Sequence, residues 1–144
     1  LGPSALPCAR RIQARYPQAE IHGLHSRVTD VERTYADFGD TLRALYRAGT
    51  PLIVLCAAGI VIRSLAAVLG EKDSEPPVLA VAEDGSAVVP LLGGLGGVNR
   101  MARELAAHLQ VSAAITTSML TVNDVKAPHS QCPRARPTAA LPAA

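Results

Sequence analysis

Two turns built from small residues follow strand-like apolar segments, and both could bind an anion through backbone N–H groups. The first is the Cys-Ala-Ala-Gly sequence at 56–59, and the second is the Gly-Gly-Leu-Gly-Gly sequence at 93–97. A helical pattern follows each turn, and small residues let a carboxylate approach the amides at a helix N-terminus. If both turns lie at the carboxyl ends of strands in one sheet, they border a single crevice, where open α/β sheets usually bind ligands.

The candidate ligand-binding residues lie in these two turns and in the segments that follow them. Arg63, one turn into the first helix, could clamp a carboxylate with two hydrogen bonds, or pair with Glu71 or Asp73 as a surface residue. The small residues could equally serve packing, and Asn99 could be a helix N-cap or first-turn residue. The full candidate set is Ala57, Ala58, Gly59, Arg63, Gly93, Gly94, Gly96, Gly97, Asn99 and Thr116.

Side chains that could act as a catalytic nucleophile, base or metal ligand are few. Cys56 stands at a strand-to-helix turn, where a thiol near a helix N-terminus has a lowered pKa, but a Cys at such a position is more commonly buried as a small core residue. No His lies near it in the sequence, so the catalytic residues stay unassigned. His22 and His25 point to opposite faces of a strand, and the three cysteines are widely spaced. We therefore predict no metal site and no cofactor.

The composition excludes several classes of protein. The 144 residues fit one domain, and 49% of them are hydrophobic, which is enough to fill a core. A net charge of +2, with dispersed basic residues and 3% aromatics, gives no basis for nucleic-acid binding. No apolar run reaches the roughly 18 residues that a membrane span needs. An odd number of cysteines without a signal peptide fits the cytoplasm.

The order of helical and strand patterns predicts an α/β fold. We expect three layers, with a mostly parallel sheet, helices on both faces and one antiparallel hairpin around Asp84-Gly85. The predicted helices span residues 3–16, 38–48, 59–69 and 98–109, and the predicted strands span 19–24, 52–56, 78–82, 87–91 and 111–116.

We expect residues 1–117 to form the domain and residues 118–144 to be a disordered tail rich in Pro and Ala. Domains of this kind normally open with a strand, whereas this sequence opens with a helical pattern. The leading strand is therefore expected to be missing, as in a fragment of a longer protein.

Four sequence segments, in this order and spacing, resemble the N-terminal domain of CbiG-type cobalamin biosynthesis proteins. They are CAAGIVIR, DSEPPVLAVAEDGSAVVPLL, GGLGGVN and AAITT, and the resemblance runs from about residue 6 to 117. It implies a cobalt-precorrin-5A hydrolase, which opens a δ-lactone on the corrin precursor and releases acetaldehyde. It also implies a tetrapyrrole substrate and a second, C-terminal domain. Related domains occur fused to precorrin-3B C(17)-methyltransferase.

This sequence departs from the family at the second turn. The family usually has the form GGH-x-GG-x-N there, whereas here Leu95 follows Gly94 directly, so one residue and the His are absent. Two functions fit this pattern. The first is a domain of corrin synthesis, either a lactone hydrolase or the part of a methyltransferase fusion that is not the methyltransferase. The second is a non-catalytic module that binds a tetrapyrrole or docks a partner enzyme.

Overall fold

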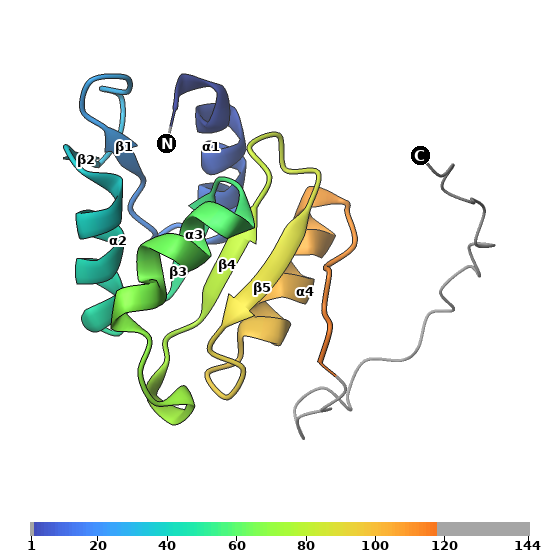
Figure 1. Cartoon of the computed structure of the whole chain (residues 1–144). Coiled ribbons are helices and arrows are strands. Elements are labelled where there is room, and N and C mark those ends of the chain that lie inside the picture. The colour runs from blue at the N-terminus through green and yellow to red at the C-terminus, as the bar shows by residue number, and fades with distance from the viewer. Residues whose placement is uncertain (1, 118–144) are drawn as a thin grey trace, which may run out of the picture.

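The computed structural model describes residues 2–117, which form a mixed α/β protein (Figure 1). Short 3-10 helices lie at Pro3–Ala5, Ala66–Val68 and Lys72–Ser74. The α-helices are α1 (Leu6–Arg15), α2 (Phe38–Arg47), α3 (Ala58–Leu65) and α4 (Val98–Leu109). The strands are β1 (His22–Leu24), β2 (Arg33–Tyr35), β3 (Leu52–Leu55), β4 (Val78–Val81) and β5 (Val88–Leu92).

The five strands form two small sheets. In the larger sheet, of order β3-β4-β5, β3 and β4 are parallel while β4 and β5 are antiparallel. The predicted Asp-Gly hairpin is therefore confirmed, and Gly85 has the positive φ of 79° that its turn requires. The smaller sheet pairs β1 with β2 in parallel, over a connection of loop residues only.

Helix α2 shows why the local sequence signals were reliable. The Asp37 carboxylate accepts a hydrogen bond from the N–H of Asp40 at 2.7 Å, which is a standard N-cap. Gly49 follows the helix with a φ of 74°, as expected for a residue that ends a helix in the left-handed conformation. These signals fix the helix within one residue of its predicted bounds.

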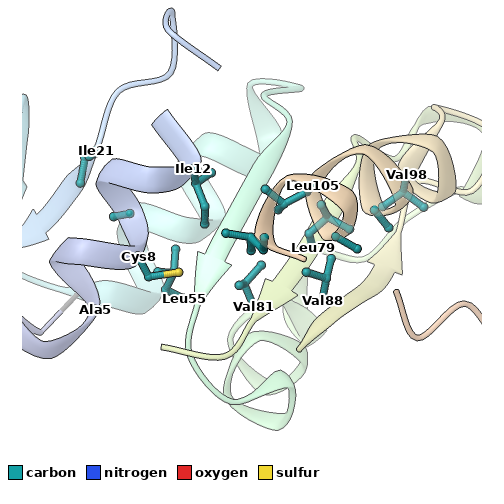
Figure 2. Packing of buried hydrophobic residues seen from close by; sticks show 14 residues of the cluster. Ala5, Cys8, Ile12, Ile21, Leu55, Leu79, Val81, Val88, Val98 and Leu105 are labelled. Atoms are coloured by element: carbon teal, nitrogen blue, oxygen red, sulfur yellow. The ribbon is translucent and has the colours of Figure 1, made fainter. Parts of the chain in front are cut away.

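The core consists of two hydrophobic clusters separated by the alternation of side chains along β3 and β4. Leu55, Leu79 and Val81 belong to the cluster that also contains α1 and α4 (Figure 2). Val54 and Ala80 belong to the other cluster, which contains the buried residues of α2 and α3. Because all four residues of β4 are buried, β4 is the strand on which both clusters depend.

The prediction of the fold holds in its coarser form. The described part of the chain is mixed α/β, with four α-helices and five strands. The three-layer arrangement, with one mostly parallel sheet between two layers of helices, stays a prediction. The sheet of three strands contains one parallel and one antiparallel pair. The residues at 118–144, expected to be a tail, lie outside the described part of the chain.

The predicted final strand at 111–116 is wrong. Only one bridge forms there, between Ala113 and Val88, with the N–H of Ala114 donating to the Val88 carbonyl at 2.9 Å. Backbone groups of a strand face alternate sides, so the next donor on this edge of β5 would be residue 90. Pro90 has no N–H, and the ladder stops.

Glu32 links α1 to the segment before β1. Its carboxylate accepts from Arg10 at 2.8 Å, from the Gln13 amide at 2.9 Å and from the Ile21 N–H at 3.1 Å. The hydrogen bonds from Gln13 and Arg10 lower the pKa of Glu32 from 4.5 to about 2. A carboxyl group with a lowered folded-state pKa stabilises the fold above its unfolded pKa, and this stabilisation is lost as the pH falls toward the folded pKa.

We therefore expect Glu32→Gln to lower the free energy of unfolding at pH 7. The difference in the free energy of unfolding from the unmodified chain should shrink as the pH falls from 4.5, the ordinary pKa of the carboxyl, to about 2, its pKa in the folded protein. Urea unfolding followed by far-UV circular dichroism at a series of pH values measures it. Asp30→Asn is the control, because the Asp30 side chain is 94% exposed and lies 3.9 Å from Arg10. A difference that stays constant down to pH 2 would contradict the assignment.

Candidate functional site

The two small-residue turns lie at opposite ends of the sheet, so the prediction of one shared crevice is wrong. The turn at 56–59 follows β3, which runs parallel to β4. The turn at 93–97 follows β5, which runs antiparallel to β4, and Gly93 contacts Pro77 just before β4 begins. Figure 1 shows the glycine turn at the bottom of the view and the β4–β5 hairpin at the top. The candidate residues therefore form two groups.

The first group lies where β3 leads into α3. Ala57 precedes the helix with non-helical backbone angles, φ −58° and ψ 133°, and no side chain caps the helix. The first intrahelical donors are Ile60 and Val61, whose N–H groups point to the Ala57 carbonyl at 2.9 and 3.4 Å. The N–H groups of Ala58 and Gly59 have no intrahelical acceptor, as at any helix start, and can therefore donate to a bound anion.

Arg63 folds back over this turn. Its Nη1 donates to the Gly59 carbonyl at 3.3 Å, and a Cβ built on Gly59 would lie 3.1 Å from the same nitrogen. Within residues 2–117, Arg63 forms no ion pair with Glu71 or Asp73, the alternative considered from the sequence. The side chain is exposed, so its remaining donors face solvent beside the amino end of α3. This arrangement suits a carboxylate ligand.

Cys56 does not have the properties predicted for a nucleophile. Burial raises the pKa of its thiol, and the nearby Glu83 carboxylate raises it further. Its sulfur lies 3.6 Å from the Ala57 carbonyl. The raised pKa disfavours a nucleophile and favours the other role considered from the sequence, a small core residue: Cys56 is partly buried and packs against the cluster that contains residues of α2 and α3. Among residues 2–117, no group of three His, Cys, Asp or Glu side chains could hold a metal ion.

Glu83 lies near the first group, because its carboxylate raises the pKa of Cys56, and it is not among the candidate residues chosen from the sequence. It lies two residues after the end of β4 and accepts a hydrogen bond from the Ser4 hydroxyl at 2.9 Å. Because β3 and β4 are parallel, residues just after each strand lie at the same end of the sheet. This position after a buried strand was the signal available in the sequence. With Arg63 and Glu83, this end of the sheet carries one positive and one negative side chain near the turn.

The second group is the glycine turn at 93–97, and the structure gives several of its residues packing roles. Gly93 and Gly97 have φ values of 82° and 90°, which favour glycine. A Cβ on Gly96 would lie 3.3 Å from the Pro77 ring, whereas Gly94 faces open space. The conformation of the turn alone accounts for Gly93 and Gly97.

Asn99 is a first-turn residue of α4, one of the two roles considered from the sequence. Its side chain is buried, and its Nδ2 donates to the Thr117 hydroxyl at 2.9 Å. This bond holds the segment containing Thr116 beside the glycine turn, so Thr116 belongs to the second group. Whether any residue of either group contacts a ligand stays a prediction.

The order of the strands, the hairpin and the turn after β3 define an α/β domain. Comparison with known proteins assigns this domain to a family. Residues 40–119 match the family described as cobalamin synthesis G N-terminal. The match covers more than half of the chain, and the chain therefore belongs to this family.

Relatives agree with this assignment. The chain is 33% identical over 128 residues to the cobalt-precorrin-5A hydrolase of Salmonella typhimurium, covering 88% of this chain and 36% of that protein. It is 35% identical over 78 residues to the cobalt-precorrin-5A hydrolase of Priestia megaterium, covering 54% of this chain and 21% of that protein. The chain thus spans about a third or less of the length of these relatives.

A solved structure shares the fold. It is that of a cobalamin biosynthesis protein G homologue from Sulfolobus solfataricus, with a TM-score of 0.59 and 21% identity. The likeness covers 86% of this chain and 36% of that one. In the part of the chain that the structure describes, no helix has the length and apolar character to cross a membrane.

Proposed function

We propose that this chain acts in cobalamin biosynthesis as the tetrapyrrole-binding N-terminal domain of a cobalt-precorrin-5A hydrolase-like protein. The observation that carries the proposal is the family match over residues 40–119, which includes both turns and Arg63. Two relatives named cobalt-precorrin-5A hydrolase support the choice of substrate. Precorrins carry several carboxylate side chains, and the amino end of α3 with Arg63 is suited to receive one of them.

Opening of a δ-lactone requires an activated water molecule and stabilisation of the oxyanion that forms. The N–H groups of Ala58 and Gly59 could bind a substrate carboxylate or that oxyanion. Cys56 is a poor base or nucleophile because its thiol pKa is raised. We therefore propose that the general base belongs to the part of the hydrolase that this chain does not span, and that this chain binds and orients the substrate.

Arg63→Ala is expected to weaken binding of a cobalt-precorrin about 10- to 100-fold, since a hydrogen bond to a charged group contributes roughly 1.5–3 kcal/mol and each 1.4 kcal/mol is about a factor of ten. Titration of the purified chain with cobalt-precorrin-5A, followed by the absorbance of the macrocycle, gives the Kd. Arg47→Ala is the matched control, because Arg47 is an exposed helical arginine at the far end of α2. Equal Kd values for both variants would remove Arg63 from the site, and absence of binding by the unmodified chain would reject the proposed function.

A second candidate function is docking of a partner domain or enzyme. Ile60 and Ile62 on α3 are 48% and 52% exposed, and Leu95 at the glycine turn is 56% exposed. Ile60 and Ile62 flank the buried Val61 on two sides of α3, so a partner that packs over this helix would cover both. We propose that the covering partner is the remainder of the hydrolase. Fusion to a precorrin-3B C(17)-methyltransferase stays a prediction from the sequence.

Inserting a His between Gly94 and Leu95 discriminates a hydrolase from a binding module. The insertion should be tolerated, because a Cβ on Gly94 meets nothing within 4 Å and Leu95 is exposed. If the chain is a hydrolase impaired by the loss of that residue, we expect acetaldehyde release from cobalt-precorrin-5A to appear. Insertion of Ala at the same place is the control. If neither insertion releases acetaldehyde while both bind the substrate, the binding module is favoured.

A further inference from the structure

A cavity of about 690 Å³ separates the two sheets. Its walls come from both sides of the molecule, with α1 on one side, α2 on the other, and the segments around β1 and β3 at its two edges. The side chains around it are mostly apolar and include Ile12, Tyr16, Leu42, Leu45 and Ile53. A cavity of this size between two sheet edges is far larger than the small voids of an ordinary core.

The edges that face this cavity carry unpaired backbone groups. The Leu52 N–H donates to Pro77 beside β4, at 2.8 Å, and successive residues of a strand face alternate sides. The N–H and C=O groups of Ile53 and Leu55 therefore point away from β4. On β1, the carbonyl of Ile21 and the N–H of His25 bond to β2, at 3.1 and 2.8 Å.

The same alternation turns the backbone groups of His22 and Leu24 away from β2. Both His22 and Ile53 line the cavity. Two strands thus present free hydrogen-bonding edges to one apolar space, and buried backbone groups of this kind are almost always paired in folded proteins. One further strand between β1 and β3, at the usual spacing of about 4.8 Å from each, would pair both edges.

We infer that this cavity is the seat of a β-strand that runs parallel to β3 and leads directly into the segment before α1. The direction follows from the position of α1. Ser4, just before α1, bonds to Glu83 after β4, so the amino end of α1 lies at the carboxyl end of the parallel strands. In Figure 1 the N end of the chain lies at the same end of the molecule as the β4–β5 hairpin.

A strand that enters α1 from the cavity must therefore end where β3 and β4 end, and so run parallel to them. With this strand in place, the sheet order becomes β2-β1-new-β3-β4-β5, one continuous sheet. The new strand, α1 and β1 would then form a βαβ unit, the ordinary connection between parallel strands. Such a strand, buried between helices on both faces, should consist almost wholly of apolar residues.

Hydrogen exchange of backbone amides tests this inference. In the chain as given, the amides of Ile53 and Leu55 should exchange much faster than that of Val54, which faces β4. A strand of about six residues, Val-Ile-Val-Leu-Val-Ile, is then joined to Leu1 through a short Gly-Ser linker. Exchange at His22, Leu24, Ile53 and Leu55 should slow at least about 100-fold, because ladder amides exchange only when the sheet opens. The protein should stay monomeric on size-exclusion chromatography.

The matched control carries Asp at the two central positions of the added strand, and should leave these four amides unprotected. Several outcomes would overturn the inference. One is strong protection of Ile53 and Leu55 in the chain without the added strand. Another is equal protection by the control. A third is protection that appears only in a dimer, because the occupant would then come from a second copy.

Discussion

Replacement of Gly93 by alanine is expected to lower the free energy of unfolding by about 3 kcal/mol, through steric overlap and backbone strain. Gly93 has a φ of 82°, which side chains of L-residues rarely adopt. A Cβ built there would lie 2.6 Å from the Pro76 carbonyl oxygen and from the backbone of Pro77. These neighbours are backbone atoms of a double-proline segment and cannot move aside easily. Urea unfolding followed by far-UV circular dichroism suits a protein without Trp.

Gly94→Ala is the control for this prediction. A Cβ on Gly94 meets nothing within 4 Å, and its φ is not positive. We expect its stability to stay within about 0.5 kcal/mol of the unmodified chain. Equal effects at both positions would show that the turn does not pack against Pro76 and Pro77 as described.

Leu79→Ala is expected to lower the free energy of unfolding by about 3–4 kcal/mol, within the range for large core side chains. Leu79 is fully buried in β4, the strand shared by both hydrophobic clusters, and packs in the cluster with α1 and α4 (Figure 2). Because β3 and β5 flank it, the sheet cannot collapse readily into the space that truncation leaves. The same urea unfolding experiment measures the change.

Leu95→Ala is the comparison for Leu79→Ala, since it removes the same atoms from a side chain that is 56% exposed. Its effect should be within about 0.5 kcal/mol. A small loss for Leu79 would mean that β4 is not the centre of the core.

Strong local signals in the sequence predicted their elements well. The N-cap Asp37 and Gly49 bounded α2, the apolar run before Cys56 gave β3, and Asp84-Gly85 gave the hairpin. The final strand could not be predicted in this way, because its failure depends on Pro90 facing the outer edge of β5. Which edge a proline faces is fixed by strand pairing, and pairing is not local.

The candidate site shows the same limit. The residues of each turn were found from their small side chains, but the hairpin that reverses β5 moves Gly93 to the opposite end of the sheet from Gly59. The hairpin was itself predicted, so this consequence was within reach of the sequence. The raised pKa of Cys56 was not, because desolvation depends on the elements that cover the thiol.

The proposed function raises the question of which end of the sheet would bind the tetrapyrrole. We propose that a carboxylate of the macrocycle binds at Ala58, Gly59 and Arg63, where helix N–H groups without an intrahelical acceptor lie beside a guanidinium. The glycine turn, in contrast, is explained largely by packing against Pro77 and by the bond between Asn99 and Thr117.

Titration of the ¹⁵N-labelled chain with cobalt-precorrin-5A, followed by two-dimensional NMR, tests this account most directly. We predict that the amide signals of Ala57, Ala58 and Gly59 shift first and most, together with the side-chain signal of Arg63. Signals of Gly94 and Leu95, at the opposite end of the sheet, should change little. Shifts confined to the glycine turn, or no shifts at saturating ligand, would contradict it.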